Sequence, residues 1–140
     1  MAELTAFTPT TRDEFAQLAR DRKNDFDLLR SQGQWTTSVY IGGYIVEARL
    51  KCKICELPEV DNLPAIFKTH NLLALIIFAG LTKALKARPA IENNLLKINQ
   101  YHSDSSWRYK CHDPAHQYDS DKLNEWLFDP NDGVITWLRL

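Results

Sequence analysis

WTTSVYIGGYIVEARLKCKICEL, residues 35–57, decides the fold because its apolar side chains fall on two opposite faces of a helix at about 100° per residue. The first stripe comprises Val39, Gly43, Val46, Leu50, Ile54 and Leu57. The second comprises Ile41, Ile45, Ala48, Cys52 and Cys55. A helix with two apolar faces needs two packing partners. We expect a central helix that packs inward on its own bundle and outward on a second subunit of a homodimer. The second stripe is taken as the dimer interface, although the pattern alone does not distinguish which stripe faces the partner.

The composition indicates one globular domain spanning residues 1–140. This length is enough to bury a substantial core but not to form two domains of ordinary size. The 17 basic and 18 acidic residues give a formal net charge of -1, so the overall charge favours no class of partner. A protein that binds nucleic acid would need its basic residues gathered locally.

The start of the chain, MAELTAFTPTTRDEF, lacks the basic segment and apolar run of a secretory signal, so we expect a cytoplasmic protein. The longest apolar run, residues 72–79, is far shorter than the ~20 residues that cross a bilayer, and it predicts a buried helix rather than a membrane span. Three cysteines without a secretory context indicate free thiols.

Capping residues and apolar spacing predict the other helices. Residues 11–14, Thr-Arg-Asp-Glu, match a capping box, so a first helix begins there and ends near residues 31–33. A third helix begins near residues 68–70 and stops at Gly80, and a fourth follows Ile91, Leu95 and Ile98. The absence of strand-like alternation predicts an all-α fold, an antiparallel bundle of four to five helices.

Two further segments stand out. Gly42 and Gly43 each cost the central helix ~1 kcal/mol of helix propensity relative to Ala, which suggests a close backbone approach at this point. Residues 102–119 are polar, aromatic and rich in histidine, and they lack helical periodicity. We expect them to form a long loop, a kind of segment that often carries function, before a last helix capped by Ser120.

Three short motifs follow one another along the chain. They are YIGGYIVE at residues 40–47, KTHNL at residues 68–72, and WRY at residues 107–109. This order resembles the HEPN (higher eukaryotes and prokaryotes nucleotide-binding) family of helical domains, over a stretch from about Trp35 to Tyr109. The resemblance implies a HEPN-like bundle of four or five helices, commonly dimeric. It also implies a setting in prokaryotic toxin–antitoxin, defence or stress systems, with a nucleotidyltransferase-type protein or RNA as partner.

HEPN ribonucleases carry an arginine, then four to six residues, then a histidine. Here Arg108 is followed by His112 after three intervening residues and by His116 after seven. Metal-independent cleavage of RNA needs a base, which His112 is able to supply, and a cation, which Arg108 is able to supply. Because the spacing departs from the family pattern, we expect a non-catalytic binding or interaction module. A HEPN-type ribonuclease using Arg108 and His112, and a structural bundle unrelated to HEPN, are the alternatives.

The candidate pocket is centred on Glu47. This residue lies with Lys51 in a polar strip of the central helix, where a half-buried carboxylate needs a cation. The WRY motif offers one, so we expect a Glu47–Arg108 pair. The pair either shapes a pocket below the loop or only ties the loop to the bundle.

Other residues complete this candidate site for a nucleotide or RNA. His70, at a predicted helix start, either contacts a phosphate or forms hydrogen bonds within the chain. Trp107 and Tyr109 either stack on bases beside Arg108 or pack the loop onto the bundle.

The cysteines and two of the histidines also suggest a zinc site. Cys52 and Cys55, together with Cys111, His112 and His116, superficially offer tetrahedral zinc ligands. Both helix cysteines lie in the second apolar stripe, where small buried residues are expected. We therefore expect no metal and no cofactor.

Overall fold

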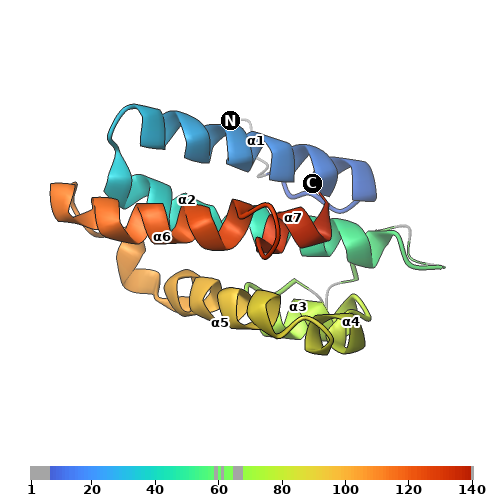
Figure 1. Ribbon diagram of the computed structural model, residues 1–140. Helices are drawn as coiled ribbons and strands as arrows, with labels where there is room; N and C mark the ends of the chain where they lie inside the picture. The colour runs from blue at the N-terminus through green and yellow to red at the C-terminus, as the bar shows by residue number, and fades with distance from the viewer. Residues whose placement is uncertain (1–6, 59, 61, 65–67, 140) are drawn as a thin grey trace, which may run out of the picture.

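The structure of the protein is a computed structural model, which describes residues 7–58, 60, 62–64 and 68–139. It is a bundle of α-helices (Figure 1). The helices are α1 (Arg12–Ser31), α2 (Trp35–Cys55), α3 (Leu72–Phe78), α4 (Thr82–Lys86), α5 (Pro89–Ser103), α6 (Gln117–Phe128) and α7 (Val134–Leu138). Two short 3-10 helices, η2 (Ser105–Arg108) and η3 (Pro114–His116), join α5 to α6. The described ranges contain no strand, so the all-α prediction is confirmed.

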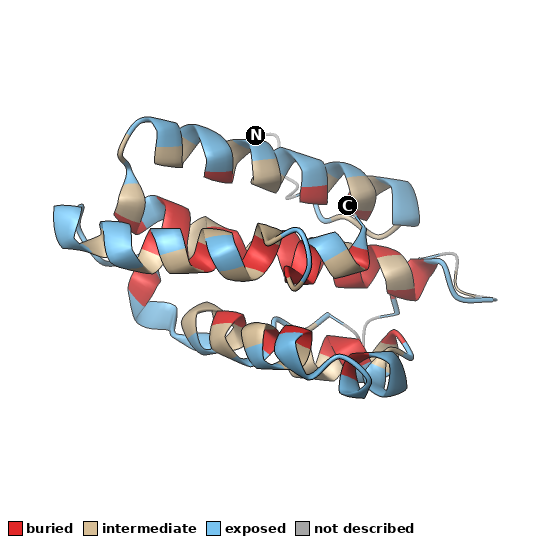
Figure 2. Ribbon diagram, viewed as in Figure 1, coloured by how far each residue is buried: buried red, intermediate tan, exposed pale blue. Residues whose placement is uncertain are grey.

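Helix α2 lies at the centre of the bundle. Figure 1 shows α1 along one side of it, α3, α4 and α5 along the other, and α6 running in front of it. Helix α2 contacts α1, α3, α5, α6 and α7. Of its 21 residues, 14 are buried, whereas the outward faces of the surrounding helices are exposed (Figure 2). The two apolar stripes are therefore real, and the same chain covers both of them.

The predicted dimer interface needs correction for this reason. Ile45, Ala48, Cys52 and Cys55 are all buried within the single chain, and Ile41 is partly buried against the same core. These side chains leave no free apolar stripe for a second copy, because other helices of the same chain already pack on it. A homodimer through another surface stays a prediction.

The first helix boundary agrees with its capping residues. The Glu14 amide donates to the Thr11 hydroxyl at 3.3 Å, and the Thr11 amide donates to the Glu14 carboxylate at 3.1 Å, so the predicted capping box is confirmed. Helix α1 ends at Ser31, two residues before Gly33, whose φ of +69° lies in the left-handed region that favours glycine.

The start of α3 differs slightly from its prediction. Helix α3 begins at Leu72, because the Asn71 side chain accepts hydrogen bonds from the amides of Leu73 and Ala74 at 3.0 and 3.3 Å. Residues 68–70 precede this cap and are not helical. The stop at Gly80 is confirmed, since its φ is +72°.

The long loop predicted at residues 102–119 is shorter than expected. Pro89 occupies the first turn of α5, where proline is tolerated, and the helix runs on to Ser103, so His102 lies in its last turn. Helix α6 begins at Gln117, and Ser120 lies inside it rather than at its cap. The Ser120 hydroxyl instead shares a buried hydrogen bond of 2.6 Å with Ser38 of α2.

The described residues also bear on the cysteines and on membrane insertion. Cys52 and Cys55 are buried and Cys111 is exposed, and all three are free thiols. Among the helices that the structure describes, none is long and apolar enough to span a bilayer. Residues 1–6, part of the segment examined for a secretory signal, lie outside the described residues.

The burial of Ile45 gives a test of the corrected packing. We expect Ile45→Ala to lower the free energy of unfolding by about 2–5 kcal/mol, because it leaves a cavity in the core of one chain. The loss should be the same at protein concentrations about a hundredfold apart, measured by urea denaturation, since no subunit contact is removed. A loss that depends on concentration would restore the interface assignment.

Candidate functional site

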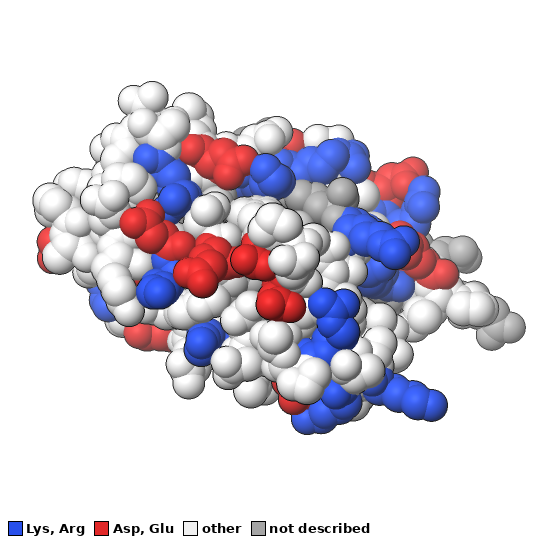
Figure 3. Space-filling model, viewed as in Figure 1, with Lys and Arg blue, Asp and Glu red and all other residues white. Residues whose placement is uncertain are grey.

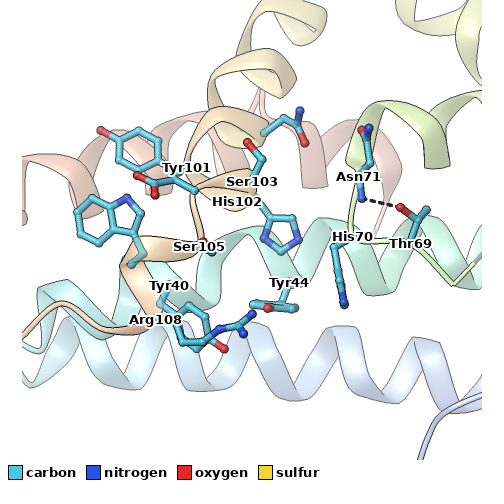
Figure 4. Close-up of a pocket in the computed structure, with 13 residues that line it drawn as sticks. Tyr40, Tyr44, Thr69, His70, Asn71, Tyr101, His102, Ser103, Ser105 and Arg108 are labelled. Carbon is cyan, nitrogen blue, oxygen red and sulfur yellow. Dashed lines mark hydrogen bonds between the residues drawn. The ribbon is translucent and has the colours of Figure 1, made fainter.

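A pocket of about 370 Å³ lies where α2, the segment before α3, the end of α5 and η2 meet (Figure 4). Its walls carry aromatic, imidazole and guanidinium groups from all four of these parts of the chain. These groups belong to Tyr40, Tyr44, His70, Tyr101, His102, Trp107 and Arg108. Residues that are far apart in the sequence therefore form one polar and aromatic hollow.

Beneath this pocket, Glu47 gathers three hydrogen-bond donors. Its Oε1 atom lies 2.8 Å from Nδ1 of His70 and 2.9 Å from Nε2 of His102, and its Oε2 atom accepts from Nζ of Lys51 at 3.3 Å. The side chains of Glu47 and Lys51 are each 9% exposed, and that of His102 is 2% exposed. The predicted Glu47–Arg108 pair is therefore wrong: among the described residues, Glu47 pairs with Lys51 and the two histidines.

The ionisation of Glu47 follows from this arrangement. Burial alone would raise the pKa of the Glu47 carboxyl, but the hydrogen bond from His102, the charge of Lys51 and the hydrogen bond from His70 outweigh it and lower that pKa. The carboxylate is thus charged at neutral pH and can only accept hydrogen bonds. Each imidazole nitrogen that faces it must therefore carry a proton.

Gly43 makes room for His102. A Cβ atom on Gly43 would lie 2.3 Å from Nδ1 of the His102 ring, so the imidazole packs directly on the backbone of α2. At Gly42 the nearest atom to such a Cβ would be in Phe26, at 3.4 Å, which is an ordinary contact. The close approach predicted for this glycine pair is confirmed, and Gly43 is the residue that requires it.

His70 lines the pocket and contacts Glu47 through one of its two ring nitrogens. Its Nδ1 atom is held by Glu47, whereas its side chain is 73% exposed, so Nε2 is accessible to a ligand. An imidazole oriented by a carboxylate in this way can donate a hydrogen bond to an anion or, when Nε2 is unprotonated, accept a proton.

Arg108 provides the cation of the pocket. Its guanidinium lies near Tyr40 and Tyr44 (Figure 4), and its interactions with the hydroxyls of Tyr44 and then Tyr109 raise the pKa of Arg108. Tyr44 also packs edge-on against the His102 ring, with 4.6 Å between ring centroids, and against Tyr40 at 5.5 Å. No carboxylate among the described residues pairs with Arg108, so its charge is available to a bound anion.

The other predicted site residues have different environments. Lys51 lies below the pocket and does not line it, and Trp107 is buried in the wall against Tyr101. Tyr109 is 77% exposed and His112 is also exposed, and neither lines the pocket. Within the described part of the chain, no three His, Cys, Asp or Glu residues are arranged to hold a metal ion.

Sequence reasoning did not identify His102, Tyr40 or Tyr44 as site residues. A signal for His102 was present, because it continues the apolar helical spacing of Leu95 and Ile98 and so belongs to the buried face of α5. Tyr40, Tyr44 and Glu47 share a face of α2, because Tyr44 follows Tyr40 by four residues and Glu47 follows Tyr44 by three.

Comparison of the chain with family models, curated proteins and solved structures gave no match. The HEPN assignment therefore stays a prediction that rests on the three motifs.

The glycine pair allows a matched test of the site. We expect Gly43→Ala to displace the His102 ring from Glu47 and to lower the free energy of unfolding by about 1–3 kcal/mol, because a buried charge loses a donor. Gly42→Ala should be neutral, or stabilising by up to ~1 kcal/mol, since it improves helix propensity without a clash. Equal stability of the two variants in urea would contradict this account of Gly43.

The lowered pKa of Glu47 predicts acid sensitivity. A carboxyl group whose pKa is lower in the folded protein than in the unfolded protein stabilises the fold at pH values above its unfolded pKa, which is about 4.5 here. This stabilisation is lost as the pH falls through the pKa of the folded protein. The stability difference between the protein and Glu47→Gln should therefore be largest near neutral pH and shrink below about pH 4.5. Denaturant titrations at several pH values measure it.

Glu125→Gln, at an exposed site on α6, serves as the control for that series. A difference between the protein and Glu47→Gln that grows as the pH falls would show that the sign assigned to Glu47 is wrong.

Proposed function

We propose that the protein is a non-catalytic, HEPN-like binding module whose pocket takes the phosphate group of a nucleotide or RNA. This proposal rests on two groups that line the same pocket. One is the guanidinium of Arg108, which lacks a carboxylate partner among the described residues, and the other is the accessible Nε2 of His70. Arginine binds phosphate through charge-assisted hydrogen bonds, which are stronger than neutral ones.

The walls and size of the pocket support the same ligand class. Tyr40 and Tyr44 offer aromatic rings beside the cation, an arrangement that suits a base attached to the phosphate. The volume of about 370 Å³ falls within the range of sites that hold small organic ligands, about 300–1,000 Å³. A carboxylate ligand would use the cation but would leave the aromatic wall without a function.

The setting of this activity is proposed from the resemblance alone. It comprises a prokaryotic toxin–antitoxin, defence or stress system, with a nucleotidyltransferase-type protein as partner. A homodimer belongs to the same proposal, and it would use a surface other than the second stripe of α2, which the chain itself buries.

Binding of AMP and of a short single-stranded RNA to the pure protein tests the proposal, by fluorescence anisotropy of labelled ligands. Arg108→Gln should weaken binding by about tenfold, the cost of one charge-assisted hydrogen bond. Lys110→Gln is the matched control, because Lys110 lies two residues away, stacks on Trp107 and does not line the pocket. No binding by the unaltered protein, or equal effects of the two variants, would refute the proposal.

A metal-independent ribonuclease is the second candidate, and one observation favours it. The Glu47–His70 pair has the geometry of a general base with its orienting carboxylate, with Arg108 lining the same pocket as the cation. In such a reaction, Nε2 of His70 would take the proton of a 2′-hydroxyl as that oxygen bonds to phosphorus, and the 5′-oxygen would leave with a proton from water. His112, the base expected from the sequence, lies outside the pocket lining.

Incubation of the protein with RNA in EDTA separates the two candidates. The binding proposal predicts no cleavage above a buffer blank. Cleavage that is lost in His70→Gln and kept in His112→Gln would establish the ribonuclease instead. His112→Gln is a suitable control because that side chain is exposed and does not line the pocket.

A further inference from the structure

A second hollow, of about 380 Å³, lies between the first half of α1 and the last turns of α2. Its charged lining comprises Arg12, Asp13, Arg20, Arg49 and Glu56. Arg49 follows Glu47 by two residues, about 200° around α2, so this groove opens on the opposite face of the helix from the pocket below η2. The two cavities share no lining residue.

The positive charge of this groove is only partly neutralised. Arg12 pairs with Asp13 at 2.8 Å, but Arg20 donates to the neutral Gln17 amide oxygen at 2.8 Å and has no carboxylate partner among the described residues. Arg49 reaches the Glu56 carboxylate only at 3.8 Å. Among the described residues that line the groove, three guanidinium groups thus face two carboxylates, so these residues carry excess positive charge.

Arg49 is held in place before any ligand binds. Its side chain is 15% exposed, its Nη1 atom lies 3.2 Å from the Cys52 thiol, and its Nε atom donates to the Leu138 carbonyl at 3.4 Å. A guanidinium fixed by its own chain loses little conformational freedom on binding. Partial burial also reduces solvent screening of its charge.

Basic side chains gather in this region of the molecule. Figure 3 shows Lys and Arg side chains concentrated over the end where α1 begins and α2 ends, whereas acidic side chains are more frequent towards the middle of the same face. Positive charge at this end of the molecule would attract an anion from solution.

We propose that this groove binds a phosphate group, carried either by inorganic phosphate or by a small phosphate monoester. A tetrahedral dianion can accept hydrogen bonds from several guanidinium groups at once, which matches Arg20 and Arg49 on the two walls. The volume of the groove leaves room for a small organic group beyond the phosphate. This site is independent of the proposed nucleotide pocket.

The test is a titration of the ¹⁵N-labelled protein with sodium phosphate against sodium chloride at equal ionic strength, followed by NMR. Saturable shifts are expected in the amides of Ala16 and Cys52, which line the groove. Arg20→Gln should weaken phosphate binding by about tenfold. Shifts that do not saturate, or that chloride reproduces, would overturn the proposal.

Arg22→Gln is the matched control. Arg22 lies on the same helix as Arg20, pairs with Asp25 at 2.6 Å and does not line this groove, so its loss should change affinity by less than about twofold. If Arg20→Gln and Arg22→Gln weakened phosphate binding equally, the binding would reflect general charge attraction, and the proposed site would be refuted. Arg12→Gln, at an exposed position, gives a second test that leaves the partly buried Arg49 intact.

A parallel titration with glycerol 3-phosphate identifies the source of the phosphate group. Tighter binding than inorganic phosphate indicates a monoester, and equal affinity indicates inorganic phosphate. Arg108→Gln should leave both titrations unchanged, because Arg108 lines the other pocket. The failure of this site and the failure of the proposed nucleotide pocket are thus separate results.

Discussion

The structure depends on the hydrogen-bond donors that surround the buried carboxylate of Glu47. Transfer of a carboxylate from water to a protein interior costs several kcal/mol unless donors replace the lost hydration. Glu47 receives those donors from Lys51 one turn along α2, from His102 at the end of α5, and from His70 before α3. Because each donor comes from a different part of the chain, one side chain fixes the relative positions of the elements that form the pocket.

The same principle extends along the central helix. Thr36 and Ser38 are also buried on α2, and each has a distant partner: the Thr36 hydroxyl accepts from the Asp113 amide at 2.9 Å and contacts His116, while Ser38 bonds to Ser120. Polar groups that are buried on α2 cannot be hydrated, so each of them must be matched by a specific neighbour. Apolar stripes set the burial of α2, and its polar residues set the positions of α5, η3 and α6.

Much of the local structure could be predicted from the sequence, because helix boundaries depend on neighbouring residues. The Thr11 capping box, the Gly80 stop and the close approach at the glycine pair all follow from short-range rules. Which helix covers which stripe of α2 could not be predicted, since both stripes are equally apolar and the choice depends on the whole chain. The sequence predicts Arg108 as the partner of Glu47 because the WRY motif supplies a cation, and it predicts His102 in a loop.

The direct test of the central claim is a ¹³C NMR titration of the Glu47 side-chain carboxyl in the intact protein. The account predicts a midpoint below 4.5, because hydrogen bonds and the Lys51 charge outweigh burial. It also predicts that the midpoint moves upward when the histidine donors are removed. A midpoint above 4.5 in the unaltered protein would mean that the carboxylate is buried without these donors, and would contradict the account of both the pocket and the fold.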